Sequence, residues 1–110
     1  MPGPPPNPDL AELARLLGEE NVRLLVRTFL TEYPGLMQTL KAGDRNTRVR
    51  IAHSLKSNTR VVGARTLSAR FADLERRLAD PGQPDLAAGE YEALLGELET
   101  DVRPLRQFAL

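Results

Sequence analysis

The chain has 110 residues, which is enough for one domain with a buried core and too few for two. Its 15 basic and 15 acidic side chains cancel, so the net charge gives no support to nucleic-acid binding or to an electrostatic membrane patch. The chain has no cysteine and one histidine, which excludes disulfides and leaves too few ligands for a typical structural zinc site.

The first eight residues, Met-Pro-Gly-Pro-Pro-Pro-Asn-Pro, form a proline-rich stretch. We expect residues 1–8 to be a flexible or extended leader that does not start a helix, and residues 9–110 to form the domain. A spacer explains this composition better than a ligand for a proline-binding partner. Because no apolar run approaches the roughly 18 residues of a spanning helix and no signal-peptide pattern is present, we expect a cytoplasmic protein with no membrane contact. Met1 favours a free-standing chain.

Apolar residues then recur at steps of three and four, the spacing of one helical face. A short first helix is expected from Asp9, which forms an acidic cap with Glu12, up to Gly18. A second helix is expected over about 19–41, with a kink at Pro34, where a backbone donor is missing. The apolar stripes of these two helices are Leu10, Leu13, Leu16 and Leu17, then Val22, Leu25, Phe29, Leu36 and Leu40.

Three more helices follow. Asp44 can cap a third helix over about 45–62, which ends at Gly63, and a fourth is expected over about 65–79. Residues 80–84 are expected to form a loop, and a fifth helix is expected from near Asp85, with its last turns kinked or frayed at Pro104. The expected buried residues are Ile51, Leu55, Val62, Leu67, Phe71, Leu74, Leu78, Tyr91, Leu95, Leu98, Val102 and Leu105.

Alternation of period two, which would indicate strands, is absent, so the predicted fold class is all-α. Four long amphipathic helices with short connections predict an antiparallel up-down four-helix bundle, with the short additional N-terminal helix covering one end.

The histidine, His53, lies in the third predicted helix and points away from its apolar stripe, which falls about 180° around the helix. Its neighbours on the same face are Lys56, Ser57 and Arg60. Neutral imidazole is a nucleophile near pH 7, and a phosphoryl group carried on its distal nitrogen needs cations nearby. The face around His53 therefore suits phosphate chemistry, with Ser57 small enough to admit a partner.

Glu75 is the second informative residue. The third and fourth helices are joined by a tight turn at Gly63 and must pack antiparallel. His53 lies 10 residues before this glycine and Glu75 lies 12 after it (63 − 53, 75 − 63), so both are roughly 15 to 18 Å from the turn. A carboxylate at that height would accept a hydrogen from the proximal ring nitrogen and leave the distal nitrogen free to attack. The alternative is a solvated Glu75 paired with Arg70 or Arg76.

Val49 and Val61 are apolar but fall on the exposed half of the wheel around His53. Two apolar side chains flanking a nucleophile favour a docking surface for another protein. The role of Arg60 stays open: it either binds the phosphoryl group or the partner's acidic site, or it keeps the face soluble.

These residues resemble the histidine-containing phosphotransfer (HPt) domain. The resemblance is carried by Ala52-His53-Ser54-Leu55-Lys56-Ser57-Asn58, followed by Val62-Gly63-Ala64, Leu67 and Leu74-Glu75. The family pattern has a lysine three residues after the histidine, a small residue four after it, Gly-Ala ten and eleven after it, and a Leu-Glu or Ile-Gln pair near the end of the next helix. The resemblance extends from about Leu10 to Leu105, and it departs from the pattern mainly at Ser57, where glycine is commoner, and at Arg60 and Val61.

The resemblance implies that His53 accepts a phosphoryl group from a receiver-domain phospho-aspartate and passes it to another receiver, assisted by Lys56 and Glu75. The implied partners are response-regulator receiver domains or a hybrid histidine kinase, with Mg expected on the partner receiver and no cofactor bound by this chain. Because glycine-rich nucleotide loops and carboxylate clusters are absent, we expect a phosphocarrier and not an enzyme that uses ATP. We also expect a monomer.

Two alternatives remain. A non-catalytic helical interaction module would bind a kinase or receiver without carrying phosphate. An enzyme acting on small phosphate esters would turn over without a protein partner, and the sequence offers little for it beyond one histidine.

Overall fold

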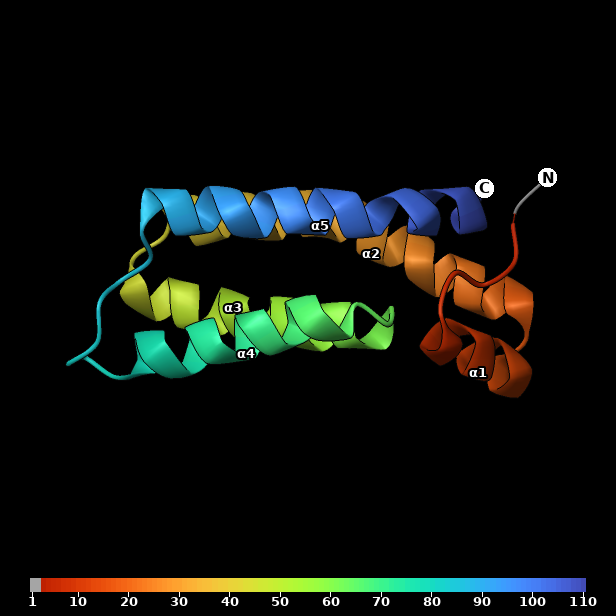
Figure 1. Ribbon diagram of the computed structural model, residues 1–110, viewed down its shortest axis with the longest axis horizontal. Helices are drawn as coiled ribbons and strands as arrows, with labels where there is room; N and C mark the ends of the chain where they lie inside the picture. The colour runs from red at the N-terminus through yellow and green to blue at the C-terminus, as the bar shows by residue number, and fades with distance from the viewer. Residues whose placement is uncertain (1–2) are drawn as a thin grey trace.

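The computed structural model describes residues 3–110, and these residues form five α-helices and no strand. The helices are α1 (Pro8–Leu17), α2 (Glu19–Ala42), α3 (Arg45–Val61), α4 (Arg65–Ala79) and α5 (Ala88–Ala109). Figure 1 shows α2 to α5 lying lengthwise, α2 beside α5 and α3 beside α4, with α1 at one end. The prediction of an all-α fold is confirmed. None of the helices in the described part of the chain combines the length and apolar character that crossing a membrane requires.

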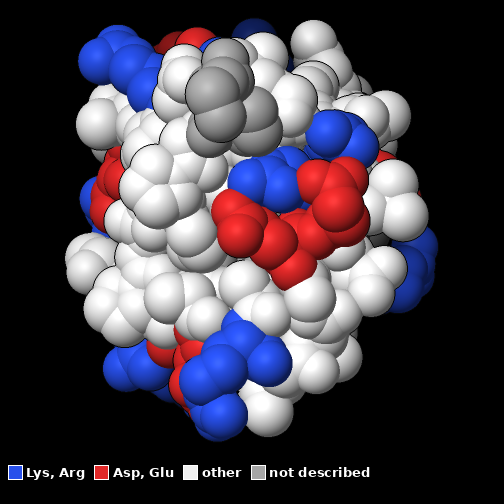
Figure 2. All heavy atoms as spheres, turned by 90° about the vertical axis from the view of Figure 1, so that its right-hand side faces the viewer, with Lys and Arg blue, Asp and Glu red and all other residues white. Residues whose placement is uncertain are grey.

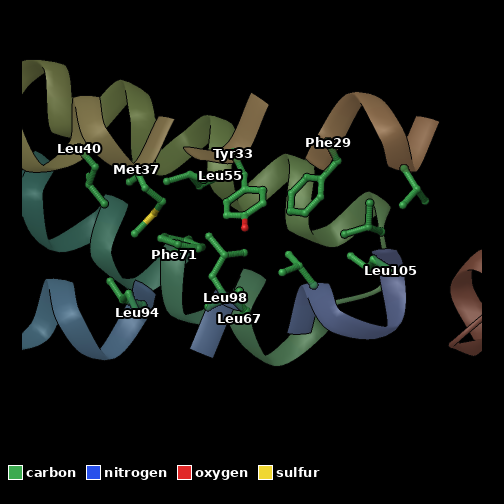
Figure 3. Close-up of a cluster of buried hydrophobic side chains, with 14 of the residues drawn as sticks. Phe29, Tyr33, Met37, Leu40, Leu55, Leu67, Phe71, Leu94, Leu98 and Leu105 are labelled. Atoms are coloured by element: carbon green, nitrogen blue, oxygen red, sulfur yellow. The ribbon is translucent and has the colours of Figure 1, made fainter. Parts of the chain in front are cut away.

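The core runs along the inside of the four long helices. Figure 3 shows Met37, Phe71 and Leu98, from α2, α4 and α5, pointing into the same interior. Phe29 stacks on Tyr33 with ring centroids 5.6 Å apart. Each fully buried leucine or phenylalanine contributes roughly 1.5–3 kcal/mol of burial free energy, so this shared interior is what holds the helices together.

The predicted core stripe is correct throughout α4, and it is correct in part in the other four helices. Several expected core residues are only partly buried (Leu13, Leu25, Leu36, Ile51 and Leu95) or exposed (Leu16 and Leu17). The interior also contains residues that the sequence analysis did not select: Val26, Tyr33, Met37, Leu94 and Phe108. Where two adjacent residues are both apolar, as at Leu25-Val26 and Leu94-Leu95, the helical period alone does not decide which one faces inward.

The first helix starts earlier than predicted. Asn7, not Asp9, is its N-cap: the Asn7 side chain accepts a hydrogen bond from Leu10 N at 2.9 Å, and Pro8 is the first helical residue. The last two residues of the expected leader therefore belong to the cap and the helix, and the expectation that this stretch does not start a helix is wrong for Pro8. Met1 and Pro2, which the same expectation covered, lie outside the described residues.

Helix ends elsewhere follow from caps. Asp44 caps α3 as predicted, accepting from Thr47 N at 2.9 Å. The start of α5 at Ala88 lies three residues beyond Asp85, the predicted start. The Asp85 carboxylate instead accepts from Arg48 at 3.1 Å and from the backbone N–H of Leu86 at 2.6 Å, so it holds the loop.

The two internal prolines do not end their helices. α2 continues through Pro34 to Ala42, and α5 continues through Pro104 to Ala109. The predicted fraying after Pro104 is wrong, because Phe108 is fully buried and its carbonyl accepts from Arg23 of α2 at 3.1 Å.

Charges of both signs are interspersed on the surface. Figure 2 shows acidic and basic side chains next to one another at the end of the molecule that carries α1. Some of the ion pairs behind this pattern join exposed neighbours on one helix, such as Arg15 with Glu12. Exposed pairs of this kind add little to stability, so packing and not charge determines the fold.

Among the described helices, α3 and α4 share the most extensive contact. Arg45, at the start of α3, donates to the carbonyls of Leu78 at 2.8 Å and Asp80 at 2.7 Å near the end of α4. At the other end the pair turns at Gly63, whose φ of 84° lies in the left-handed region that favours glycine. The register between α3 and α4 is thus fixed at both ends.

Candidate functional site

His53 lies on the outer side of α3, opposite the buried residues Ala52 and Leu55. Its side chain is 59% exposed, and its Nδ1 atom lies 2.8 Å from Oε2 of Glu75 on α4. His53 and Glu75 were predicted to lie at similar distances along their helices from the α3–α4 turn, and their side chains are indeed in contact.

Lys56 completes the cluster. Its Nζ atom donates to Oε1 of Glu75 at 2.7 Å, so the two oxygens of one carboxylate serve two side chains of α3. The hydrogen bond from Lys56, followed by the one from His53, lowers the pKa of the Glu75 carboxyl against the opposing effect of its partial burial. Glu75 is therefore ionised at neutral pH. The alternative pairing with Arg70 or Arg76 is not formed, because these side chains bind Glu97 and Asp73.

The geometry determines the protonation pattern of the ring. An ionised carboxylate only accepts hydrogen bonds, so the Nδ1 atom of His53 carries the proton. In the neutral ring, Nε2 then keeps its lone pair. Because the ring is more than half exposed, this lone pair is available to an electrophile on a partner molecule.

A hollow of about 830 Å³ begins beside this cluster and runs toward α1. It is lined by Lys56, Ser57, Arg60 and Val61 of α3, by apolar side chains of α1, α2 and α4, and by charged side chains of α1 and α4. A second hollow of about 240 Å³ lies between α2 and α3, and Leu25 and Val61 line both. Val61 is 43% exposed, so the apolar surface predicted beside His53 exists at this residue.

Val49 does not join that surface. It is partly buried and packs against the core, whereas the sequence analysis expected it to be exposed. The reason is its angular position: Val49 lies on the same side of α3 as Lys56, and that side faces α4.

The family model for the Hpt domain matches residues 24–107. The chain belongs to the Hpt domain family. No curated protein and no solved structure matches it. Hpt domains are phosphocarrier modules of two-component phosphorelays, where they take part in histidine phosphotransfer and interact with receiver domains and kinases.

The matched part of this Hpt domain begins at residue 24 and leaves out α1. Yet α1 contributes Asp9, Glu12 and Leu13 to the hollow beside His53. It is held there by Asn7, whose side chain donates to Val62 O at 2.8 Å, and by an ion pair between Asp9 and Arg65 at 2.6 Å.

Two features of the Hpt site were missed by sequence reasoning. One is this α1 wall. The other is Ser68 of α4, which is 7% exposed and donates to the backbone carbonyl of Lys56 at 2.8 Å. A signal for Ser68 existed: it lies seven residues before Glu75, two turns away on the same helical face. Among residues 3–110, no three His, Cys, Asp or Glu side chains are grouped closely enough to hold a metal ion.

Proposed function

We propose that this Hpt domain carries a phosphoryl group on Nε2 of His53, taking it from the phospho-aspartate of one receiver domain and passing it to another. The scaffold we infer is an antiparallel up-down four-helix bundle that acts as a monomer. The observation that supports the proposal most is the 2.8 Å contact between His53 Nδ1 and Glu75, because it leaves the exposed Nε2 as the nucleophilic atom.

In the proposed step, the Nε2 lone pair attacks the phosphorus of an aspartyl phosphate. The N–P bond forms while the P–O bond to the aspartate breaks, and the aspartate leaves as a carboxylate with the electron pair. The Nδ1 proton stays in place, so the phosphorylated ring carries a positive charge that faces the ionised Glu75 carboxylate. The reverse reaction delivers the group to a second receiver.

The partner receiver supplies the remainder of the chemistry. Phosphoryl transfer depends mainly on positioning and on cations that offset the charge of the transferred group, and the magnesium of a receiver provides such a cation. This chain provides the nucleophile, the Lys56 cation beside it and a docking face. It binds no cofactor of its own in this proposal.

We infer that the docking face is the lining of the hollow beside His53, which includes Ser57, Arg60 and Val61. Ser57 is exposed and small, so it leaves His53 open to approach. Arg60 is exposed and forms no ion pair within residues 3–110, which suits it to bind a carboxylate of the partner. An apolar surface on the receiver would cover Val61 and Leu25.

The test is transfer of label from a phosphorylated receiver domain to the purified protein. We expect label on the wild-type chain and none on His53→Gln, with binding of the receiver retained by both. Incubation with ATP alone should give no label. Acceptance of label by His53→Gln would refute the assignment, and receiver binding without any label on the wild type would favour the non-catalytic interaction module.

A further inference from the structure

The two edges of the His53 ring face different sides of α3. The Nδ1 atom lies 2.8 Å from Glu75 Oε2, so this edge of the ring is turned toward α4. Nε2 belongs to the opposite edge and is therefore turned away from α4. A phosphoryl group on Nε2 is held on that side of α3, where its negative charge needs hydrogen-bond donors or cations.

Two side chains on that side of α3 flank the histidine along the helix. With His53 at 0° on the helical wheel, Arg50 falls at about 60° and Ser57 at about 40°. Lys56, which contacts α4, falls at about 300°, on the other side of the ring. Arg50 lies one turn before His53 and Ser57 one turn after it. Residues at these spacings are neighbours on a helix surface, with Cβ atoms about 5–6 Å apart.

The direction of helical side chains brings these groups together. The Cα–Cβ bonds of a helix tilt toward its N-terminus, so the His53 ring leans over the turn that carries Arg50, and the Ser57 hydroxyl leans toward His53. A guanidinium binds phosphate oxygens through two parallel N–H groups, and a hydroxyl donates one further hydrogen bond. The two residue types together suit a phosphoryl group.

The Arg50 guanidinium is available in the resting structure. Arg45 and Arg48 of the same helix are held by backbone carbonyls, to which each donates at 2.8 Å. Arg50 is exposed and forms no ion pair within residues 3–110, and its hydrogen bond to the Thr47 hydroxyl is long, at 3.4 Å. The pKa of Asp44 is lowered mainly by hydrogen bonds from Thr47 and less by the charge of Arg50, so Asp44 does not hold the guanidinium.

The Ser57 hydroxyl is available as well. A hydroxyl inside a helix often donates to the carbonyl four residues before it, as Thr59 does to Leu55 at 2.6 Å. Ser57 is exposed and forms no hydrogen bond within residues 3–110. The Lys56 ammonium, by contrast, is already bound to Glu75 at 2.7 Å.

We propose that Arg50 and Ser57 form the binding site for the phosphoryl group on His53, with the guanidinium and the hydroxyl both donating to its oxygens. This site rests on the function proposed above and extends it. Glu75 holds the ring from the side of α4, and Arg50 and Ser57 hold the phosphoryl group from the opposite side.

The direct test uses no receiver. Phosphoramidate phosphorylates an exposed histidine: the N–P bond to Nε2 forms while the P–N bond to ammonia breaks, and ammonia leaves with the electron pair. Because His53 is the one histidine of the chain, the product carries a single phosphohistidine. Its phosphorus NMR signal, followed against pH, gives the acid dissociation constant of the phosphoryl group.

Donors at the phosphoryl oxygens favour the dianion, so their loss makes the group a weaker acid. We expect Arg50→Met to lower the dissociation constant about tenfold and Ser57→Ala about fivefold, the effects of a charge-assisted and of an ordinary hydrogen bond. A wild-type titration for Arg50→Met or for Ser57→Ala would overturn the proposed site.

Two matched controls keep the change of residue and move it away from the phosphoryl group. Arg103→Met removes an exposed arginine of α5 that forms no ion pair within residues 3–110. Ser54→Ala removes a hydroxyl next to His53 in sequence but about 100° around the helix from it. Both should titrate like the wild type, and a change equal to that of the test variants would overturn the proposal.

Transfer from a receiver tests what the site does in the proposed function. Arg50→Met should shift the equilibrium of the phosphoryl group about tenfold from His53 toward the receiver, with unchanged affinity for the unphosphorylated receiver. Lost affinity with an unchanged equilibrium would make Arg50 a docking residue and overturn the proposal. If the wild type takes no label from a receiver, the proposed function fails, and the titration of chemically phosphorylated His53 still decides the roles of Arg50 and Ser57.

Discussion

At the scale of single residues, the site depends on how Glu75 divides its two carboxylate oxygens between His53 and Lys56. One oxygen orients the imidazole and the other anchors the carboxylate. A glutamine at this position would accept from the ring with its one oxygen, but it would lack the negative charge that faces a phosphorylated, positively charged ring. The carboxylate therefore supports both the free and the phosphorylated state of His53 in the proposed cycle.

The pKa of Glu75 predicts an acid-dependent loss of stability. Its pKa is lowered in the folded protein from an ordinary value of 4.5, so the unfolded chain binds this proton more tightly than the folded one. The contribution of Glu75 to stability is therefore fully present above 4.5 and is lost as the pH falls through the lower folded-state pKa. We expect the free energy of unfolding of Glu75→Gln to fall less steeply with decreasing pH than that of the wild type. Urea unfolding at pH values from neutral into the acid range measures this.

The matched control is Glu99→Gln, which changes an exposed glutamate of α5 that forms no ion pair within residues 3–110. Its stability should follow that of the wild type across the same pH range. If Glu75→Gln also follows the wild type, the carboxylate is not held as the structure indicates.

The sequence predicts part of this residue-scale picture. Counting residues from the turn at Gly63 places His53 and Glu75 at similar distances along α3 and α4, and in the structure their side chains are in contact. The contact between Lys56 and Glu75 was not predicted, because a helical wheel gives the face of a side chain but not its rotamer. Lys56 was expected to reach toward a phosphoryl group, and in the resting structure it reaches toward Glu75.

At the scale of elements, the connection between α1 and the α3–α4 turn fixes one end of the site. The Asn7 side chain caps α1 and also donates to Val62 O at the end of α3. A Cβ atom at Gly63 would overlap the Asn7 amide, so this glycine is required both by its φ of 84° and by the close approach of the N-terminal segment.

Gly63→Ala should therefore destabilise the protein in two separable ways. The left-handed backbone costs about 1 kcal/mol for alanine, and the overlap with Asn7 adds a further penalty of about 1–3 kcal/mol. Asn7→Ala alone should cost about 1 kcal/mol through loss of the cap. In the double variant Gly63→Ala with Asn7→Ala, the overlap is relieved. We therefore expect the double variant to lose less unfolding free energy than the sum of the two single losses. Additive losses in urea unfolding would contradict the contact.

Local pattern explains why some element boundaries were predicted and others were not. The start of α3 was predicted correctly because Asp44 caps a stretch with a helical period, and α4 was predicted correctly from its period and the preceding turn at Gly63, without a side-chain cap. Asn7-Pro8 is itself a helix-start signal, an N-cap followed by proline at the first helical position, but the prolines before it favoured a leader. The start of α5 depends on Arg48 of α3 binding Asp85, a contact across 37 residues that no local pattern contains.

At the scale of the whole molecule, the surface around His53 is built from four helices. The all-helical fold follows from the period of the apolar residues, so the sequence predicts it. The hollow beside His53 does not follow, because it depends on where α1 packs, and that is set by the distant contacts of Asn7 with Val62 and of Asp9 with Arg65. Since α1 lies outside the matched Hpt segment, its wall is a feature of this chain that the family match does not cover.

The docking proposal predicts that a charge placed in the lining of this hollow weakens partner binding. Val61→Glu should reduce receiver affinity about tenfold, since burying an unpaired carboxylate against an apolar surface is costly. The matched control is Leu24→Glu: Leu24 is 59% exposed and lines neither of the two hollows that include Val61. Calorimetric titration with the receiver should show a loss for Val61→Glu and wild-type affinity for Leu24→Glu. Equal affinities for both variants would place the docking face elsewhere.

The central claim is that His53 receives phosphate on Nε2, and locating the phosphoryl group by NMR tests it most directly. The protein, labelled with nitrogen-15 in its histidine, is incubated with a phosphorylated receiver, and coupling between phosphorus and each ring nitrogen is measured. We predict coupling to Nε2 and a retained proton on Nδ1, where Glu75 accepts it. Phosphate on Nδ1, or on any residue other than His53, would contradict the account.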